Sequence, residues 1–173
     1  MLENDRVVVW NIAWLKQQYP LHRHVYDLVG VYYAPGDRMI VSTDGTRRPV
    51  TTKAGDIAFQ RSGVTHIEEG TSDPPLRAVF VELKQAGPSG ETDTASMAAP
   101  FPRDGEKQLV DNDRVTAWEH AAGTKSSAAH RHVRDAVVVW VDGPTPHASF
   151  VARGVIHGDD GVGPARAWIF ELK

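Results

Sequence analysis

Short apolar runs, rich in β-branched and aromatic residues, recur along the chain, and residues that favour turns separate them. In the first half these runs are Val7–Trp10, Leu28–Tyr33, Met39–Ser42, Ile57–Phe59 and Val79–Leu83. Strands of this length, with turns at this spacing, are typical of an all-β sandwich or barrel. No segment has the period of a convincing amphipathic helix. The pattern therefore predicts an all-β fold.

The second half of the chain repeats the first. Asn4-Asp5-Arg6-Val7 recurs as Asn112-Asp113-Arg114-Val115, and His22-Arg23-His24-Val25 recurs as His130-Arg131-His132-Val133, both at an offset of 108. Further on the offset falls to 91, where Gly63-Val64 and His66 match Gly154-Val155 and His157. At an offset of 89, Glu82-Leu83-Lys84 matches Glu171-Leu172-Lys173. A repeat in constant order indicates a tandem duplication.

The change of offset predicts what the second copy has lost. The fall from 108 to 91 means that the second copy lacks 17 residues that the first copy has around Arg38 to Gly55. In the first copy this segment resembles a hairpin turning at Asp44-Gly45. A whole hairpin can be deleted without changing the register of its neighbours. We therefore expect a first barrel over residues 1–84 and a shortened second barrel over 112–173. Residues 85–111 are rich in Gly, Pro, Ala, Ser and Thr, which predicts a linker or a wrapped extended arm.

Composition narrows the possible functions. A net charge of −3 over 173 residues argues against electrostatic binding of nucleic acid or of an anionic membrane. No apolar run approaches the ~20 residues that a membrane span needs. The first residues lack the pattern of a secretory signal, so we expect a cytoplasmic protein. The chain has no cysteine, and any metal must therefore be held by histidine and carboxylate side chains.

Six of the eight histidines fall at positions that match between the copies. Residues i and i+2 of a strand point to the same face, so His22 and His24 can both face a barrel interior, where His66 on a later strand can join them. Three imidazoles bind Zn, Fe, Ni or Cu and leave coordination positions open. The alternative is that each histidine is a hydrogen-bonded core residue.

These motifs resemble those of the cupin superfamily, whose first motif is G-x5-H-x-H-x3–4-E-x6-G and whose second is G-x5-P-x-G-x2-H-x3-N. His22-Arg23-His24 fits the first motif, and the segment from Gly55 to His66 fits the second. The sequence departs from the pattern at Arg61, in place of proline, and at Gly70, in place of asparagine. The glutamate of the first motif would fall at Leu28 or Val29, neither of which can ligate a metal.

The resemblance implies two double-stranded β-helix (jelly-roll) barrels, a bicupin, and two metal sites. The implied ligands are His22, His24 and His66 in the first barrel and His130, His132 and His157 in the second. Asp27 and Asp135 are optional fourth ligands, although a bulge would be needed to turn Asp27 inward. The alternative for them is a surface ion pair with Arg23 or Arg131. Loss of the hairpin could leave the second pocket open, or leave His130 and His132 too far from His157.

Other residues are weaker candidates. Glu68-Glu69 and Asp159-Asp160 follow the third histidine of each copy, where a carboxylate can orient an imidazole, but a solvated turn is the simpler interpretation. Tyr26, Tyr32 and Tyr33 could line a pocket or belong to the core. His120 and His147 have no matching histidine in the first copy, and we expect no role for them.

The function favoured by these observations is a metal-dependent enzyme that acts on a small molecule, with dioxygenase chemistry preferred. The metal is a divalent transition ion, and iron, manganese, nickel and zinc all remain open. The first alternative is a non-catalytic module that binds or senses a small ligand, since the cupin fold serves both purposes. A storage or assembly role is a third. A homodimer is expected, because small barrels commonly pair through sheet edges and faces.

Overall fold

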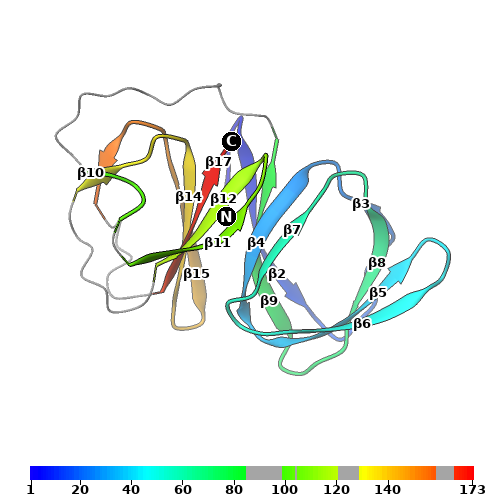
Figure 1. Ribbon diagram of the computed structural model, residues 1–173. Coiled ribbons are helices and arrows are strands. Elements are labelled where there is room, and N and C mark those ends of the chain that lie inside the picture. Colours follow the sequence, from blue (N-terminus) through cyan, green and yellow to red (C-terminus); the bar gives the residue numbers. More distant parts are fainter. Residues whose placement is uncertain (85–98, 104, 121–128, 159–165) are drawn as a thin grey trace. The chain divides into compact units, whose positions relative to one another are not determined.

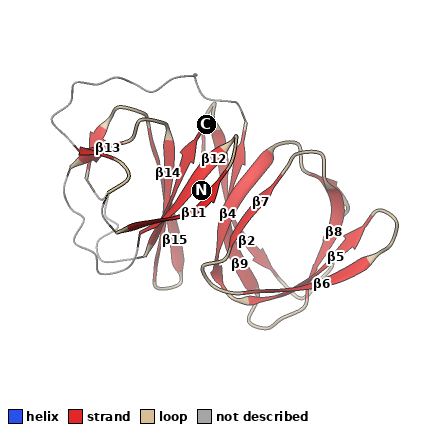
Figure 2. Cartoon of the chain, in the orientation of Figure 1, coloured by secondary structure: helices blue, strands red, loops and turns tan. Residues whose placement is uncertain are grey.

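The computed structural model describes residues 1–84, 99–103, 105–120, 129–158 and 166–173. These residues form strands and loops and contain no helix (Figure 2). In this described part of the chain, accordingly, no helix is long and apolar enough to cross a membrane. The chain divides into two compact units: the first is built around Val7–Lys84, and the second contains the described residues after Lys84 (Figure 1).

The first unit contains two sheets. The five-stranded sheet has the order β1-β2-β9-β4-β7 and consists of β1 (Leu2–Glu3), β2 (Val7–Trp14), β9 (Leu76–Leu83), β4 (Asp27–Ala34) and β7 (Ile57–Gln60). The four-stranded sheet has the order β3-β8-β5-β6 and consists of β3 (His22–Arg23), β8 (Thr65–Gly70), β5 (Gly36–Ser42) and β6 (Arg47–Thr52). The strand pairs β2–β9, β4–β9 and β3–β8 are antiparallel, as in a jelly roll.

The second unit repeats this arrangement with fewer strands. Its five-stranded sheet has the order β11-β12-β17-β14-β15 and consists of β11 (Glu106–Asp111), β12 (Val115–His120), β17 (Ala167–Leu172), β14 (Ala136–Asp142) and β15 (Thr145–Val151). Its smaller sheet has the order β10-β13-β16 and consists of β10 (Ala99–Pro100), β13 (His130–Arg131) and β16 (Ile156–His157). The equivalent strands occupy the same order in both large sheets, which confirms the predicted duplication of an all-β jelly roll.

The predicted hairpin accounts for the difference in length. In the first unit β5 and β6 form an antiparallel hairpin around Asp44-Gly45, where Gly45 has a φ of 86°. In the second unit β14 turns through Gly143 directly into β15, which occupies the place of β7 at the edge of the large sheet. The two strands of the deleted hairpin lie at one edge of the small sheet. Their loss therefore leaves the pairing of the histidine-bearing strands unchanged.

The segment 85–111 is only partly covered by the structure, since 85–98 and 104 lie outside the described residues. Its described part is not a free linker. Strand β10 pairs in parallel with β13, and β11 pairs with β12 as the edge strand of the second large sheet. Of the two predictions for this segment, a linker or a wrapped extended arm, the paired strand Glu106–Asp111 is compatible only with the second. A composition rich in turn formers did not reveal that Lys107 to Val110 continue the sheet.

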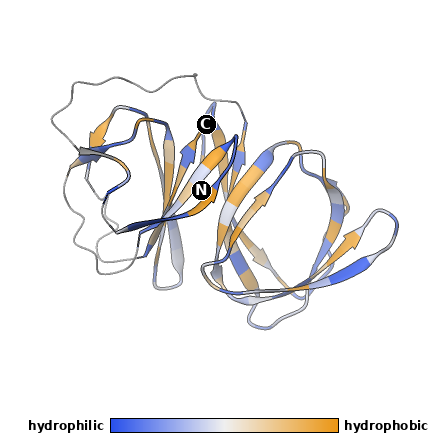
Figure 3. Cartoon of the chain, viewed as in Figure 1, coloured by the Kyte–Doolittle hydropathy of each residue, from blue (hydrophilic) through white to orange (hydrophobic). Residues whose placement is uncertain are grey.

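The interiors of the two units are packed by different residues at matching positions. In the first unit a buried cluster contains Trp14, Leu28, Tyr32 and Phe80. Apolar residues concentrate in its large sheet, where Val7–Val9 of β2 and Ala78–Val81 of β9 are buried, whereas β6 of the small sheet is mostly polar (Figure 3). Gly30 lies opposite Phe80 in the β4–β9 pairing, and a Cβ atom at Gly30 would lie 2.2 Å from Cδ1 of the Phe80 ring.

In the second unit the pair that corresponds to Gly30 and Phe80 is Val138 and Ile169. These two residues also lie opposite each other, in the β14–β17 pairing, and both belong to the buried cluster. A larger residue on one strand thus accompanies a smaller residue on the other, so each barrel keeps a filled interior.

Gly30→Ala should lower the free energy of unfolding by about 1–3 kcal/mol, because the added methyl group overpacks against the Phe80 ring and against the carbonyl oxygen of Val79. Combining it with Phe80→Ile, which imitates the second unit, should recover part of that loss. The measurement is a double-mutant cycle by urea unfolding, followed by tryptophan fluorescence. Strictly additive effects of the two substitutions would contradict the proposed steric coupling.

Candidate metal centres

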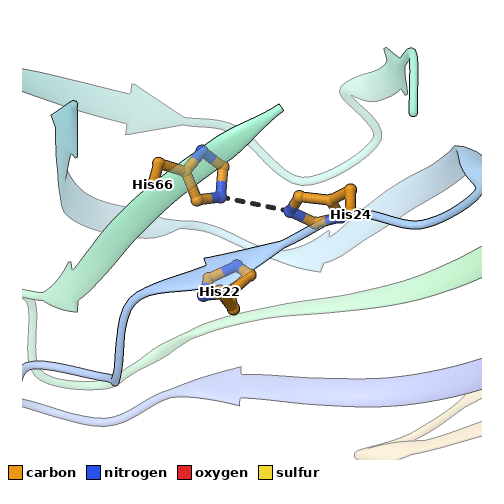
Figure 4. A group of neighbouring side chains, drawn as sticks. All are labelled: His22, His24 and His66. Atoms are coloured by element: carbon orange, nitrogen blue, oxygen red, sulfur yellow. Dashed lines mark hydrogen bonds between the residues drawn. The ribbon is translucent and has the colours of Figure 1, made fainter. Parts of the chain in front are cut away.

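The first histidine triad is assembled by the pairing of β3 with β8. His22 and His66 lie directly opposite each other in this antiparallel pair. Beyond the end of β3, the backbone N–H of His24 donates to Val64 O at 2.9 Å and the N–H of Gly63 donates to His24 O at 2.7 Å, so the ladder continues. The side chain of His24 therefore points to the same face of the sheet as that of His22, two residues earlier. Figure 4 shows the three rings turned toward one another.

The three imidazoles of the first triad are close enough to share one ion. Nε2 of His24 lies 3.1 Å from Nε2 of His66, and one ring nitrogen of each residue lies within 4.8 Å of those of the other two. Two nitrogens bound at about 2.1 Å to one ion, at an angle of about 90–110°, lie roughly 3.0–3.4 Å apart. The observed separation of His24 and His66 falls in that range.

The protonation of the first triad suits ligation. Nδ1 of His22 lies 3.0 Å from Pro20 O, which can only accept, so Nδ1 is the donor and Nε2 is the atom available to a metal. Burial lowers the pKa of His24, and the neighbouring His22 lowers it further. Burial also lowers the pKa of His66, against the opposing effect of Glu68. Both imidazoles are therefore held in the neutral form that binds metals.

The second triad has the same construction. His130 lies opposite His157 in the β13–β16 pairing, and the N–H of Gly154 donates to His132 O at 2.8 Å, as Gly63 does to His24. The ring nitrogens of the three residues again lie within 4.8 Å of one another. Loss of the hairpin has therefore not separated His157 from the other two histidines. His132 is fully buried, whereas its counterpart His24 is partly exposed.

A carboxylate that the sequence reasoning did not identify orients His132. Nδ1 of His132 lies 3.2 Å from Oε1 of Glu171, which places the proton on Nδ1. Glu171 also accepts a hydrogen bond from Nε1 of Trp118, as Glu82 accepts one from Trp10 in the first unit, both at 3.1 Å. The Nε2 atom of His132 is buried and has no hydrogen-bond partner among the described residues. A metal ion would satisfy this lone pair.

Asp27 and Asp135 do not belong to the two triads. Oδ1 of Asp27 accepts the N–H of Ser62 at 2.8 Å, and Oδ2 pairs with Arg61 at 3.1 Å. Oδ1 of Asp135 accepts the N–H of the matching residue, Arg153, at 3.0 Å. Both carboxylates thus hold the turn that leads into the third histidine. An odd offset from the preceding histidine is the reason why they point away from the ion pocket.

The remaining candidates have structural partners. Glu68 accepts the indole N–H of Trp14 at 2.8 Å and pairs with Arg38 at 3.3 Å, and Glu69 pairs with Arg47. Asp159 and Asp160 lie outside the described residues. Tyr32 belongs to the core, where burial raises its pKa. His120 pairs with Glu106 at 2.9 Å, and His147 stacks on Trp140.

A cavity adjoins the first triad. It has a volume of about 310 Å³ and is lined by Ile12, Trp14, Tyr19, Pro20, His22 and Glu68. Its wall is mainly apolar and aromatic, and its two ionisable groups are His22 of the triad and Glu68. Because Glu68 is paired with Arg38, this carboxylate does not give the cavity an unbalanced negative charge. A cavity of this kind suits a small organic molecule.

No protein-family model and no curated protein matches the chain. Solved structures do match it over nearly its whole length. AerE from Microcystis aeruginosa is 11% identical over 98% of this chain and 88% of its own, with a TM-score of 0.62. YhaK from Escherichia coli is 15% identical over 96% and 83%, with a TM-score of 0.54. Oxalate decarboxylase from Bacillus subtilis, which has Mn(II) centres, is 10% identical over 96% and 69%, with a TM-score of 0.51.

At such low identity these likenesses show the fold alone. The chain has the cupin fold, duplicated as in the two-barrel cupins that it matches. Both the cupin resemblance and the all-β architecture are therefore confirmed. The likeness does not by itself assign a reaction.

Asp27→Ala should lower the free energy of unfolding by about 1–3 kcal/mol, because it removes the charged acceptor that holds the Ser62 N–H in the turn before His66. Metal content per folded chain should stay unchanged. Asp27→Asn is the matched control, since the amide oxygen can still accept from Ser62. A drop in metal content in the Asn variant, at unchanged stability, would show instead that Asp27 is a ligand.

Proposed function

We propose that this protein binds two divalent transition-metal ions, one at each histidine triad, and acts on a small molecule at the first. The observation that carries the proposal is the environment of His132, whose Nδ1 contacts Glu171 while its buried Nε2 has no hydrogen-bond partner among the described residues. Its ring lies 5.2 Å, between centroids, from each of the other two rings of the triad. A carboxylate that fixes the tautomer of an imidazole is the usual support of a metal-binding histidine. A core histidine would use both nitrogens in hydrogen bonds.

The chemistry of the donor set restricts the metal without choosing one. Three imidazoles suit iron, manganese, nickel and zinc, and the Mn(II) centres of oxalate decarboxylase occur in the same fold. A bound ion would supply Lewis-acid or redox chemistry at positions that the protein leaves open. Since Asp27 is committed to Ser62 and Arg61, the first centre has three nitrogen donors and room for more than one external ligand.

For the first centre we propose an oxygen-dependent, dioxygenase-type reaction. The support is the combination of three converging imidazoles with the adjoining cavity, which can hold an organic molecule beside the ion. Trp14 and Tyr19 offer flat apolar surfaces to such a molecule, and His22 belongs to both the cavity and the triad. The substrate is therefore expected to be small, with an apolar or aromatic body.

A non-catalytic role as a ligand-binding module is the second candidate. The observation that favours it is the state of Glu68, the carboxylate of the cavity, which is already engaged by Trp14 and Arg38. A carboxylate held in this way is a poor general base, because its oxygens are already engaged by the indole N–H and the guanidinium. A reaction that needs proton transfer from the substrate would have to use another group.

The purified protein should contain about two divalent metal ions per chain, because each triad offers three converging imidazoles. His66→Ala and His157→Ala should each lower the content to about one, and the double variant should retain none. Elemental analysis by mass spectrometry measures this. His147→Ala is the matched control, because His147 lies outside both triads and should leave the content at two. Metal content that does not respond to His66→Ala would contradict the first centre.

Nitric oxide tests the dioxygenase proposal. It binds Fe(II) at open positions in place of O2 and produces a paramagnetic signal. The His130→Ala/His157→Ala variant, loaded with Fe(II), isolates the first centre and should produce the signal under argon. The same variant with His66→Ala added provides the blank. Iron that is bound by the first triad but gives no signal would rule out oxygen chemistry there and favour the binding module.

A further inference from the structure

The two triads differ in what covers them. In the second unit, the segment before β11 brings Phe101 onto the histidines. Strand β10 pairs in parallel with β13, Ala99 opposite His130 and Pro100 opposite Arg131, and the N–H of Phe101 then donates to Arg131 O at 2.9 Å. The backbone of Phe101 is therefore fastened to the residue that separates His130 from His132.

The ring of Phe101 lies inside the second barrel. It is 4% exposed and belongs to the buried cluster with Ala136, Val138 and Ile169. Its centroid lies 4.5 Å from the ring of His132 and 5.6 Å from Trp118, the latter in an edge-on arrangement. Phe101 thus covers both a histidine of the triad and the tryptophan that donates to Glu171.

The first unit leaves the matching surface uncovered. Trp10, the counterpart of Trp118, is 49% exposed, and no ring contact to it is present among the described residues. Part of the space for Phe101 arises where Ala136 in the second barrel replaces Leu28 of the first. Phe101 therefore fills volume that the second barrel's own strands do not fill.

The chain beyond Phe101 is also anchored. The carboxylate of Glu106, at the start of β11, is buried and pairs with His120 at 2.9 Å and with Arg103 at 3.6 Å. Phe101 therefore lies between two fixed points, the β10–β13 pairing before it and the Glu106 contacts after it. A side chain held on both sides stays in place at little further entropic cost.

We propose that Phe101 closes the second centre, so that its ion is a structural element inaccessible to external ligands, while the first centre alone exchanges ligands with solvent. This inference rests on the proposed metal binding and assigns different roles to the two sites. The physical reason is that the Phe101 ring takes the place beside the second triad that an external ligand would need. Release of the ion then requires the ring to leave its buried site, so metal binding and docking of the segment stabilise each other.

The test uses cobalt, whose absorption spectrum reports its ligands. The His22→Ala/His66→Ala variant isolates the second centre, and His130→Ala/His157→Ala isolates the first. Both are loaded with Co²⁺, treated with azide, and then with EDTA to measure the rate of ion release. Azide should change the spectrum of the first centre and leave that of the second unchanged. Release from the second centre should be slower by about ten-fold or more, because opening costs the burial of a phenyl ring.

Phe101→Ala, made in the variant that retains the second centre, should restore the azide response and accelerate release by about ten-fold. Phe101→Leu keeps an apolar side chain in the same place and should resemble the parent. Phe80→Ala removes a phenyl ring from the other unit and should leave the release rate unchanged, which separates closure from general loss of packing. If Phe101→Ala does not fold, closure is tested by comparing the azide responses of the two parent variants, each of which retains one centre.

Two results would overturn closure while leaving the proposed metal binding intact. One is an azide response at the second centre with Phe101 in place, and the other is a folded Phe101→Ala variant with unchanged release. Failure of the second centre to take up Co²⁺ at all would refute the proposed metal binding at that triad and closure with it. The three results are distinguishable from one another in the same samples.

Discussion

The antiparallel pairing of two very short strands determines where the histidines of each unit meet. In the first unit β3 is only two residues long, yet its register places His22 opposite His66, and the hydrogen bonds of His24 with Gly63 and Val64 extend it. A slip of one residue would turn His22 and His24 to the other face and abolish the convergence. The tight turn that leads to His66 is therefore as important as the imidazoles. Asp27 stabilises this turn through Ser62, and Asp135 does the same through Arg153.

Comparison of the two units separates what the triad needs from what it does not. The hairpin β5–β6 lies at the far edge of the small sheet, and its absence from the second unit leaves the pairing of His130 with His157 intact. By contrast, the hydrogen bond from a tryptophan to the glutamate on the last strand occurs in both units. Glu171 supports His132 directly, and Glu82 keeps the same tryptophan partner and acts on His24 electrostatically. Their retention in both units follows from their position on the inward face beside the triad.

The repeat made most of the architecture predictable, because matching residues in the same order imply matching strands. It predicted the two triads, and the change of offset located the missing hairpin. It could not reveal Phe101, which has no counterpart in the first copy and lies in a segment whose composition suggests a loop. The match between Glu82 and Glu171 is visible in the repeat, but the sequence alone does not show that these side chains accept from Trp10 and Trp118. The two aspartates show the limit of motif matching, since their role depends on a turn made by residues distant in sequence.

Duplication followed by divergence explains why two similar triads would be used differently. Each triad depends on the pairing register of the two strands that carry its histidines, so the three histidines of a triad are retained or lost together. The surroundings are free to change, because a core residue can be exchanged if a neighbour compensates, as Gly30 with Phe80 and Val138 with Ile169 show. Ala136, in place of Leu28, leaves space in the second barrel that the Phe101 ring occupies. Under the proposed closure, this ring gives the second triad additional apolar contact at the expense of access for external ligands. The first triad, which has a cavity beside it, is then the one to which an external molecule can bind.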